Sequence, residues 1–479
     1  MSAARIAGIY RQTPRFRVAV RIEKDAPNLG RITIPIATVI ALPFLPADPS
    51  RPGSLFLPAW ILTVGILGGV LGDVLRGGAR LAFRAQNILM FGVVLIVYVE
   101  LLQAGYLTEI DDKAVRNVFL AIALFTTSLA LGSSIAPPRL PRTVLALAGR
   151  HYSPTVLLWI LIASTALALT NFLVTTGFSI GAITDGLLAG RYDTPWVRGQ
   201  LGGWDAFRDF LSYFGYATPT LTVLLAIRLR SWFRVSVLFG ILCSALVLVF
   251  IATEGGRRNL VGIGGAAMLT WFVHIRKQIK LKHFFLIASI AMVCIIGLDI
   301  ILVARTEGYS DFSYTRSDFQ GLRVDDNFTY LGQTMRLIPA QNEFVGFRLP
   351  WFMLVRPIPR ILWQGKPIDP GFDLAATLGA KGVSFSNSVI GECYMSFGWV
   401  GIVCGGVFLG WLSRVWSQLI EHEYGATSIA LYGLGVMAMF IGIRSWSDLI
   451  FLTYPILCWY ALDRVIWAWI RHGSEMQAR

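Results

Sequence analysis

The chain of 479 residues is 55% hydrophobic, and only 15% of its residues are charged. A soluble domain carries about 25% charged residues, so the composition excludes an ordinary soluble fold. The net charge of +14 would suggest a nucleic-acid partner in a soluble protein. In a membrane protein, basic residues instead gather on the cytoplasmic side, and we therefore expect no nucleic-acid partner.

Long apolar runs recur along the chain. A span needs roughly 20 apolar residues to cross about 30 Å of hydrocarbon, and backbone in lipid must form its hydrogen bonds within its own helix. The sequence therefore predicts an all-α polytopic membrane protein with about twelve transmembrane helices. The predicted spans are residues 32–45, 55–75, 87–107, 115–136, 154–176, 209–228, 235–253, 258–275, 283–304, 397–413, 425–443 and 447–463.

The spans divide the chain into a basic N-terminal segment (1–31), a first set of spans (32–304), one large loop (305–396), the last three spans (397–470) and a short tail (471–479). Basic residues favour the segments that this topology assigns to the cytoplasm over the short loops on the other side. The bias predicts that both ends of the chain are cytoplasmic. The large loop would then lie on the outer side, with the N-terminal segment and the tail inside.

The turn before the predicted span at 258–275 reads Thr-Glu-Gly-Gly-Arg-Arg-Asn, residues 253–259. Its glycines allow backbone to approach a ligand closely, and the helix that follows presents an N-terminus that attracts anions. The arginine guanidinium suits phosphate oxygens, so Arg257 and Arg258 are predicted to bind a phosphate or diphosphate. The alternative is a tight turn whose arginines contact lipid headgroups.

The large loop carries further cations and aromatic residues. Arg305 directly follows a predicted span, and prolines fix the spacing of Arg356, Arg360 and Lys366. Trp363 lies among these cations and is suited to stacking on a sugar ring. We interpret the segment as part of the binding site. The alternative is an interfacial segment that tryptophan and cations anchor to the membrane.

A carboxylate lies where the loop enters the tenth predicted span. Glu392 sits among apolar neighbours at the membrane edge, where an ionisable group is costly and often functional. Because a partly desolvated carboxylate takes up a proton more readily, Glu392 suits a general base. The alternative is a structural partner for a nearby arginine. Arg444, in the turn before the last span, falls on the same predicted side.

The positions of the histidines limit the chemistry of the outer side, because all of them fall on the predicted cytoplasmic side. The outer loops also contain no cluster with metal-ligand spacing, and the chain has no phosphate-loop or dinucleotide motif. We therefore expect neither a metal nor another cofactor. The histidines are His151, His274, His283, His422 and His472.

These features together resemble the Wzy-type oligosaccharide repeat-unit polymerases, which belong with the O-antigen ligases in a C-type glycosyltransferase-like superfamily. The resemblance rests on the large loop before the last three spans and on the Arg-bearing turn. It also rests on Arg-Pro-x-Pro-Arg-x-x-Trp-x-x-Lys-Pro (356–367) and Gly-Glu-x-Tyr-x-x-Phe-Gly-x-x-Gly (391–401). Ligases carry a His-Asn pair where this chain has Ser386-Asn387, and the missing histidine disfavours a ligase.

The resemblance implies an enzyme of the bacterial inner membrane that polymerises undecaprenyl-diphosphate-linked oligosaccharide repeat units on the periplasmic face. The growing chain would pass to a new lipid-linked unit without a metal. Glu392, or second Glu254, would take the acceptor proton, and Asn387 and Tyr394 would join the arginines in binding the substrate. The implied partners are the lipid-linked oligosaccharide and the bilayer, with a chain-length regulator and a flippase as further candidates.

Two other interpretations remain open. The first is an O-antigen ligase or another C-type transferase that uses a lipid-linked sugar. The second is a major-facilitator-like transporter, since such a protein also has twelve spans with both ends inside. Gly69-Val70-Leu71-Gly72-Asp73, with Arg76 and Arg80, partly matches the signature loop of that family.

Overall fold

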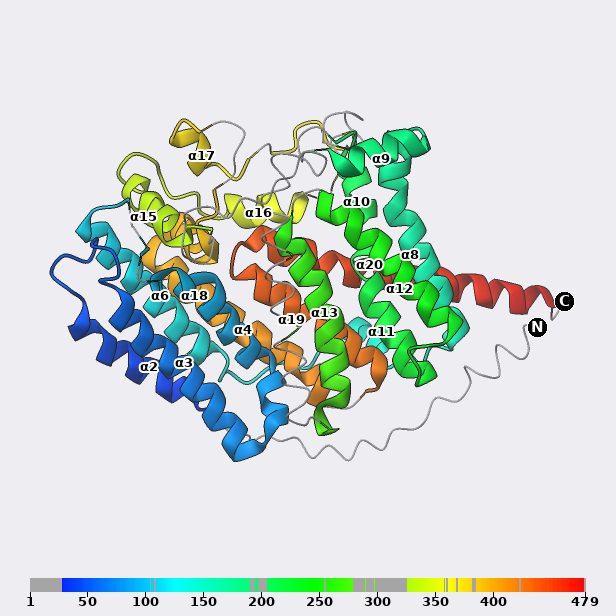
Figure 1. Ribbon diagram of the computed structural model, residues 1–479, viewed down its shortest axis with the longest axis horizontal. Helices are drawn as coiled ribbons and strands as arrows, with labels where there is room; N and C mark the ends of the chain where they lie inside the picture. The colour runs from blue at the N-terminus through cyan, green and yellow to red at the C-terminus, as the bar shows by residue number, and fades with distance from the viewer. Residues whose placement is uncertain are drawn as a thin grey trace.

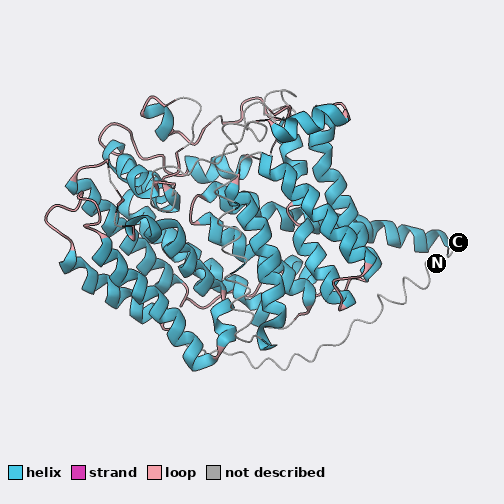
Figure 2. Cartoon of the chain, in the orientation of Figure 1, coloured by secondary structure: helices cyan, strands magenta, loops and turns pink. Residues whose placement is uncertain are grey.

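The computed structural model describes residues 28–477 except 104, 107–108, 190–193, 197–204, 254–255, 279–288, 290–296, 298–324, 357, 359–360, 368, 381–384 and 422–423. Every regular element within these residues is helical (Figure 2). The all-α prediction is therefore confirmed for the part of the chain that the structure describes.

Seven of the described helical stretches are long and apolar enough to cross a membrane. They are α3 (Phe56–Gly77), α6 (Asp112–Gly132), α8 (Pro154–Thr175), the pair α10 (Asp205–Gly215) and α11 (Thr218–Leu229), α12 (Val235–Thr253), α18 (Ser388–Glu421) and α20 (Trp446–Gln477). Each coincides with a predicted span. The set is consistent with a polytopic, membrane-embedded protein.

Most of the remaining predicted spans also coincide with helices. Three are shorter apolar helices: α2 with η1 (Gly30–Phe44), the run α4–η3–α5 (Ala85–Leu101) and α19 (Ala426–Gly442). Another is α13 (Arg257–Ile275). The predicted span at 283–304 lies outside the described residues, apart from positions 289 and 297. The total of about twelve crossings therefore stays a prediction.

The described parts of the large loop contain three helices. They are α15 (Asn327–Leu337), α16 (Arg348–Val355) and α17 (Leu374–Thr377). These helices lie along the upper edge of the bundle in Figure 1, together with α9 (Ile180–Leu188). The short helices η2 (Ala79–Phe83), α7 (Arg142–Ala148) and η5 (Arg276–Gln278) complete the described set. The loop segments thus cover one end of the helix bundle.

The helix α18 is broken where the sequence predicts that the loop becomes a span. Phe397 (φ −144°, ψ 22°) and Gly398 (φ 61°, ψ −143°) leave the helical conformation, and a positive φ is favourable only for glycine. The short part before the break folds back on the long part. A Cβ at Gly401 would collide with the Cys393 carbonyl oxygen, and one at Gly405 with the Cys393 sulfur. The Gly-x-x-Gly spacing therefore permits this reversal.

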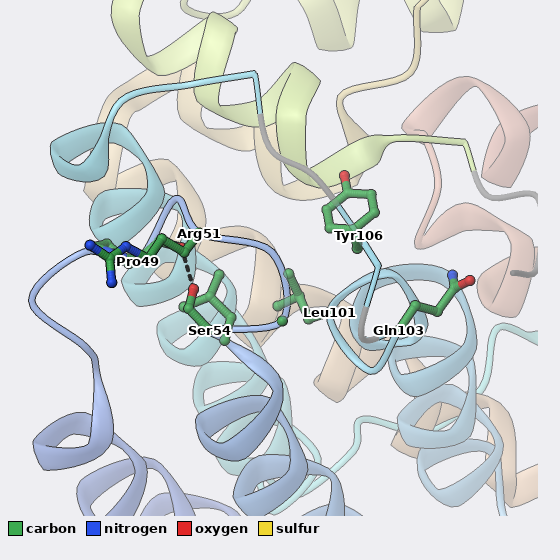
Figure 3. Close-up of a pocket in the computed structure, with 8 residues that line it drawn as sticks. Pro49, Arg51, Ser54, Leu101, Gln103 and Tyr106 are labelled. Atoms are coloured by element: carbon green, nitrogen blue, oxygen red, sulfur yellow. Dashed lines mark hydrogen bonds between the residues drawn. The ribbon is translucent and has the colours of Figure 1, made fainter. Parts of the chain in front are cut away.

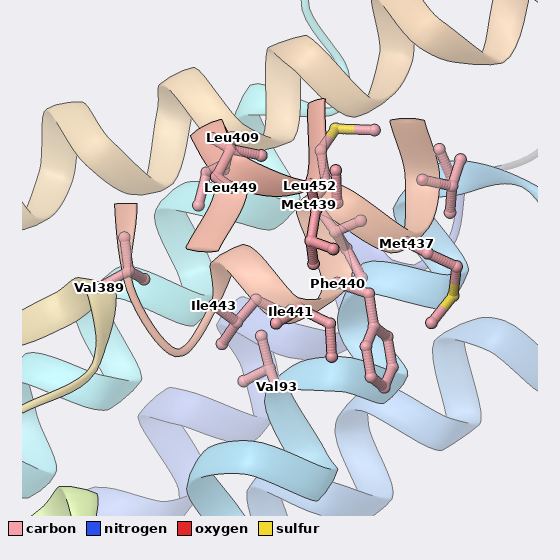
Figure 4. Packing of buried hydrophobic residues seen from close by; sticks show 14 of the residues in the cluster. Val93, Val389, Leu409, Met437, Met439, Phe440, Ile441, Ile443, Leu449 and Leu452 are labelled. Atoms are coloured by element: carbon pink, nitrogen blue, oxygen red, sulfur yellow. The ribbon is translucent and has the colours of Figure 1, made fainter. Parts of the chain in front are cut away.

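The centre of the bundle is formed by α19, which is buried along almost its whole length. Its apolar side chains pack against those of α4, α18 and α20 (Figure 4). Close backbone approach also joins α13 to α19, because a Cβ at Gly433 would meet the Ala266 carbonyl oxygen and Thr270. Tight packing of this kind drives helix association in lipid. It fixes the start of α13 relative to the α19–α20 turn.

Candidate anion-binding site

Three arginines and two aspartates form a continuous chain of ion pairs at the covered end of the bundle. Asp325 Oδ1 accepts from Arg257 Nη2 at 3.3 Å, and its Oδ2 accepts from Arg444 Nε at 2.7 Å. Asp448 Oδ2 accepts from Arg444 Nη1 at 3.3 Å, and its Oδ1 pairs with Arg258 Nε at 3.1 Å. We call these five residues the Arg–Asp chain. The structure thus brings together three of the predicted cations.

The Arg–Asp chain lies where several helices begin. Arg257 and Arg258 open α13, Asp325 precedes α15, and Asp448 lies in the first turn of α20. The start of α18 is tied to the same place, because Val389 N donates to the Ile443 carbonyl oxygen at 3.0 Å. Asn259 Nδ2 donates to the Tyr216 hydroxyl at 3.0 Å and fixes the start of α13. Helix N-termini carry partial positive charge, so the backbone adds to the attraction of anions.

The charges of the Arg–Asp chain do not cancel. Its three guanidinium groups and two carboxylates give +3 − 2 = +1. Burial alone would raise the pKa of Asp325, but Arg444, by its charge and hydrogen bond, and then Arg257 and Arg258 outweigh it and hold the pKa below its usual value. Asp325 is therefore ionised at neutral pH. The Arg–Asp chain therefore contains more guanidinium groups than carboxylates.

The two carboxylates differ in their access to solvent. The side chain of Asp448 is 2% exposed, whereas that of Asp325 is 35% exposed. Arg444, which holds both, is 19% exposed. Breaking a buried ion pair leaves an uncompensated charge and costs about 3–5 kcal/mol, so Asp448 is a fixed part of the fold. Asp325 is the carboxylate that an incoming anion can replace.

Glu392 lies beside the Arg–Asp chain, on the short first part of α18. Its Oε1 accepts from the Ser445 hydroxyl at 2.7 Å, and its Oε2 accepts from the Trp446 backbone N–H at 2.6 Å. Both donors belong to the start of α20, so the carboxylate caps that helix. The sequence proposed an arginine as the structural partner of Glu392, and the structure provides a hydroxyl and an amide. A hydroxyl within reach is also what a general base requires.

Two of the predicted cations of the large loop, Arg356 and Lys366, lie at the C-terminal end of α16. Lys366 Nζ donates to the carbonyl oxygens of Arg356 at 2.6 Å and Ile358 at 2.8 Å, which closes the C-terminal end of α16. The Arg356 guanidinium lies over the Phe451 ring of α20, 4.6 Å from its centroid. The ring of Trp363 meets that of Trp351 edge-on, with centroids 6.4 Å apart. The contact of Arg356 with Phe451 attaches α16 to α20, the helix that carries Asp448.

Two further predicted residues connect α18 to α15. Asn387 Nδ2 donates to Thr334 Oγ1 at 3.2 Å, and the Tyr394 hydroxyl donates to the Ile338 carbonyl oxygen at 3.3 Å. Both are buried and hold the short part of α18 in place. The remaining predicted site residues lie outside the described residues. They are Glu254, Arg305 and Arg360.

The sequence interpretation missed two acidic contributors. Asp325 was not selected because nothing near it in the sequence marks it as a partner of arginine. The second is Glu100, whose carboxylate accepts from Asn327 N at 2.9 Å, Asn327 Nδ2 at 3.1 Å and Phe328 N at 2.9 Å. It thereby caps α15 and fixes the position of Asp325. A lone glutamate in an apolar predicted span was the available signal.

A small pocket opens near the end of α5, apart from the Arg–Asp chain (Figure 3). The Ser54 hydroxyl donates to the Pro49 carbonyl oxygen at 2.6 Å in its wall. The pocket contains none of the predicted site residues. Its lining is Pro49, Arg51, Gly53, Ser54, Leu55, Leu101, Gln103 and Tyr106.

Comparisons with protein-family models, with curated proteins and with solved structures found no match for this chain. The chemistry of the site therefore rests on its geometry. Guanidinium groups and helix N-termini are both groups that attract anions.

Proposed function

We propose that the chain is a membrane glycosyltransferase of the polysaccharide polymerase type. It transfers a growing glycan from undecaprenyl diphosphate to a new lipid-linked repeat unit. The observation that carries the proposal is the Arg–Asp chain. A cationic cluster at the end of an apolar helix bundle suits a substrate that combines a diphosphate with a long lipid. Such a donor is already activated, so the reaction requires no nucleotide.

The predicted topology gives independent support. It assigns the turn before α13, the large loop and the turn before α20 to one side of the membrane, from the order of the predicted spans and the charge bias of the short loops. Arg257, Asp325 and Arg444 come from these three segments, and Asp325 pairs with both arginines. The proposed topology puts this end of the bundle in the periplasm, with both chain termini in the cytoplasm of the bacterium. The protein would then act at the inner membrane.

The Arg–Asp chain would stabilise the leaving group. During transfer, the bond between the anomeric carbon of the glycan and the diphosphate oxygen breaks, and its electron pair stays on that oxygen. The diphosphate displaces Asp325 and pairs with Arg257 and Arg444, while Asp448 continues to hold Arg444 and Arg258. Removing one preorganised donor to a developing negative charge typically costs ~10²–10³-fold in rate. The three arginines together would supply most of the catalysis.

Glu392 would accept the proton of the acceptor. The acceptor hydroxyl oxygen forms the new bond to the anomeric carbon, and its proton passes to the carboxylate. The Ser445 hydroxyl donates to Glu392 Oε1 in the structure. An acceptor hydroxyl takes over that hydrogen bond, while the Trp446 amide continues to orient the other oxygen. A positioned base of this kind contributes about 10²–10⁴-fold.

The test is the size distribution of surface polysaccharide after deletion of the gene in its bacterium. A polymer ladder that collapses to a single repeat unit establishes a polymerase. Loss of even the single-unit band indicates ligation, export or an earlier transfer. An unchanged ladder, in a strain without a second polymerase, favours a transporter.

Complementation then tests the site itself. Arg444→Ala should fail to restore the ladder. Arg414→Ala is the matched control, because Arg414 is similarly buried and pairs with Glu421 elsewhere on α18. If both variants restore the ladder at wild-type protein levels, the Arg–Asp chain is not the catalytic site.

A further inference from the structure

The helix α16 exposes a stripe of large apolar side chains. Phe347, Trp351 and Leu354 follow one another at i, i+4 and i+7, the spacing of a single helix face. They are 77%, 53% and 68% exposed. These residues belong to the loop that covers one end of the bundle, outside the candidate spans. In water such a stripe would be unfavourable, since each large apolar side chain gains about 1.5–3 kcal/mol on burial.

The opposite face of α16 is fixed to the bundle, so the stripe cannot turn inward. Leu349 and Met353 are buried, and the Ser447 hydroxyl donates to the Met353 sulfur at 3.0 Å. Lys366 closes the end of the helix through two carbonyl oxygens. The guanidinium of Arg356 covers an aromatic ring of α20. The exposure of the stripe is therefore a property of a well-anchored helix.

The stripe continues into the exposed surface of a candidate membrane span. The rings of Phe347 and Phe397 meet with centroids 4.8 Å apart. Phe397 begins the long part of α18, where Trp399 and Val400 are also exposed. That part of α18 is long and apolar enough to cross a membrane. One apolar surface thus runs from the span onto α16.

We infer that α16 lies in the membrane interface, with the stripe inserted among the lipid acyl chains of the leaflet next to the Arg–Asp chain. Two observations favour lipid over a protein partner. The stripe continues the exposed apolar surface of a candidate membrane span, and Trp363 and the exposed Arg348 lie beside it. Tryptophan and arginine are typical of the headgroup region. Interfacial helices insert their apolar face about 5–10 Å into this boundary.

This placement does not depend on the proposed function, but it has a consequence for it. Because α16 contacts α20 through Ser447 and Phe451, the start of α20 lies at the depth of the lipid phosphates. Arg444 and Asp448 flank this start. The Arg–Asp chain would therefore meet a lipid-linked anion without lifting its tail out of the bilayer.

Spin-label accessibility in lipid nanodiscs tests the inference. Leu354→Cys is labelled in a chain that carries Cys404→Ser, which removes the exposed cysteine of the described residues, and Cys294→Ser, which removes the cysteine outside them. Leu378→Cys, at the end of α17, is the matched control because Leu378 is also exposed and α17 lies farther out than α16 (Figure 1). Val400→Cys is the lipid-facing reference. We expect the label at position 354 to resemble that at 400, with oxygen collisions several-fold more frequent than collisions with a water-soluble nickel chelate.

Two outcomes would overturn the inference. A label at position 354 that collides mainly with the nickel chelate, as at position 378, faces water. A label protected from both reagents is covered by protein, and dipolar broadening would identify a second copy of the chain. Trp351→Cys repeats the measurement if the first variant is not monodisperse in detergent. None of these results depends on polymerase activity.

Discussion

Asp325 and Asp448 both pair with Arg444, yet they should respond in opposite ways to loss of their charge. Replacement of Asp325 by asparagine removes the exposed carboxylate that competes with an incoming diphosphate. Replacement of Asp448 removes a buried carboxylate that orients two arginines. We expect Asp325→Asn to bind diphosphate more tightly, and Asp448→Asn to bind it more weakly and to unfold at a lower temperature.

The magnitude follows from the geometry. Two unit charges about 4 Å apart attract by about 4 kcal/mol at an effective dielectric constant near 20. The side chain of Asp325 is 35% exposed, so solvent reduces its net contribution to roughly 1 kcal/mol. Because 1.4 kcal/mol corresponds to about tenfold in Kd, Asp325→Asn should lower the Kd roughly 3–10-fold. Asp448 is 2% exposed, and its replacement should cost about 3 kcal/mol or more in stability.

The assay is binding of undecaprenyl diphosphate to purified protein in nanodiscs, with undecaprenyl monophosphate as the reference for contacts of the lipid tail. Inorganic pyrophosphate separates the contribution of the phosphates. The apparent unfolding temperature of each variant reports whether the fold is retained. The wild-type protein and both variants are measured at one salt concentration, because screening weakens the contribution of exposed charges.

Each alternative result has a distinct meaning. Weaker binding by Asp325→Asn would show that the carboxylate positions the arginines and is not displaced. Equal binding would show that the ligand and Asp325 do not compete, which refutes the displacement step and leaves a diphosphate site possible elsewhere. If neither the wild type nor Asp325→Asn binds any of the probes, the Arg–Asp chain is not a diphosphate site.

Further predictions concern the base, the broken helix, the loop lysine and pH. Glu392→Gln should lower polymerisation about 100-fold or more at normal expression, and normal polymer length would exclude a general base at this position. Gly401→Ala should destabilise the protein by about 1–3 kcal/mol in thermal unfolding, because the new methyl collides with the Cys393 carbonyl oxygen; an unchanged unfolding temperature would refute that packing. Lys366→Met should make the large loop more sensitive to protease but leave polymer length normal, since the ammonium donates hydrogen bonds to carbonyl oxygens at the end of α16. Lost polymerisation with unchanged protease sensitivity would instead indicate that Lys366 binds the substrate. The pKa of Asp325 is lowered in the folded protein. The ionised carboxylate therefore contributes its full stabilisation above the unfolded pKa near 4, and this stabilisation is lost as the pH falls through the lower folded value. The stability of Asp325→Asn should not show this loss in acid unfolding.

The sequence predicted the helices well because a span is encoded locally, in the length and apolarity of one segment. It also identified Arg257, Arg258 and Arg444, since arginine in a short outer turn runs against the charge bias. It did not predict their partners. Asp325 and Arg444 are 119 residues apart, and no periodicity relates positions at that separation. Their contact depends on how several helices pack.

Local contacts were also hidden from the sequence for a physical reason. Lys366 donates hydrogen bonds to carbonyl oxygens at the end of α16. A lysine at this position in the sequence is equally compatible with binding a phosphate. The boundary predicted at 396–397 coincides with a break inside α18. The apolar run in the sequence begins where the span is predicted to begin, but it does not show that the helix already starts at Ser388, before that boundary. The segment with Glu392 is therefore helical and folded back.

The Arg–Asp chain also has an order of synthesis. Arg257 and Arg258 are translated with α13, and Asp325 follows 68 residues after Arg257. Arg444 and Asp448 come last, with the first turn of α20. A nascent chain that stops before Arg444 can form only the pair of Arg257 with Asp325, and Arg258 then lacks the buried Asp448. The complete Arg–Asp chain can therefore form only after α20 has been inserted. Before that point, Arg258 has no Asp448 to pair with, so the charges at this end of the bundle differ from those of the finished protein.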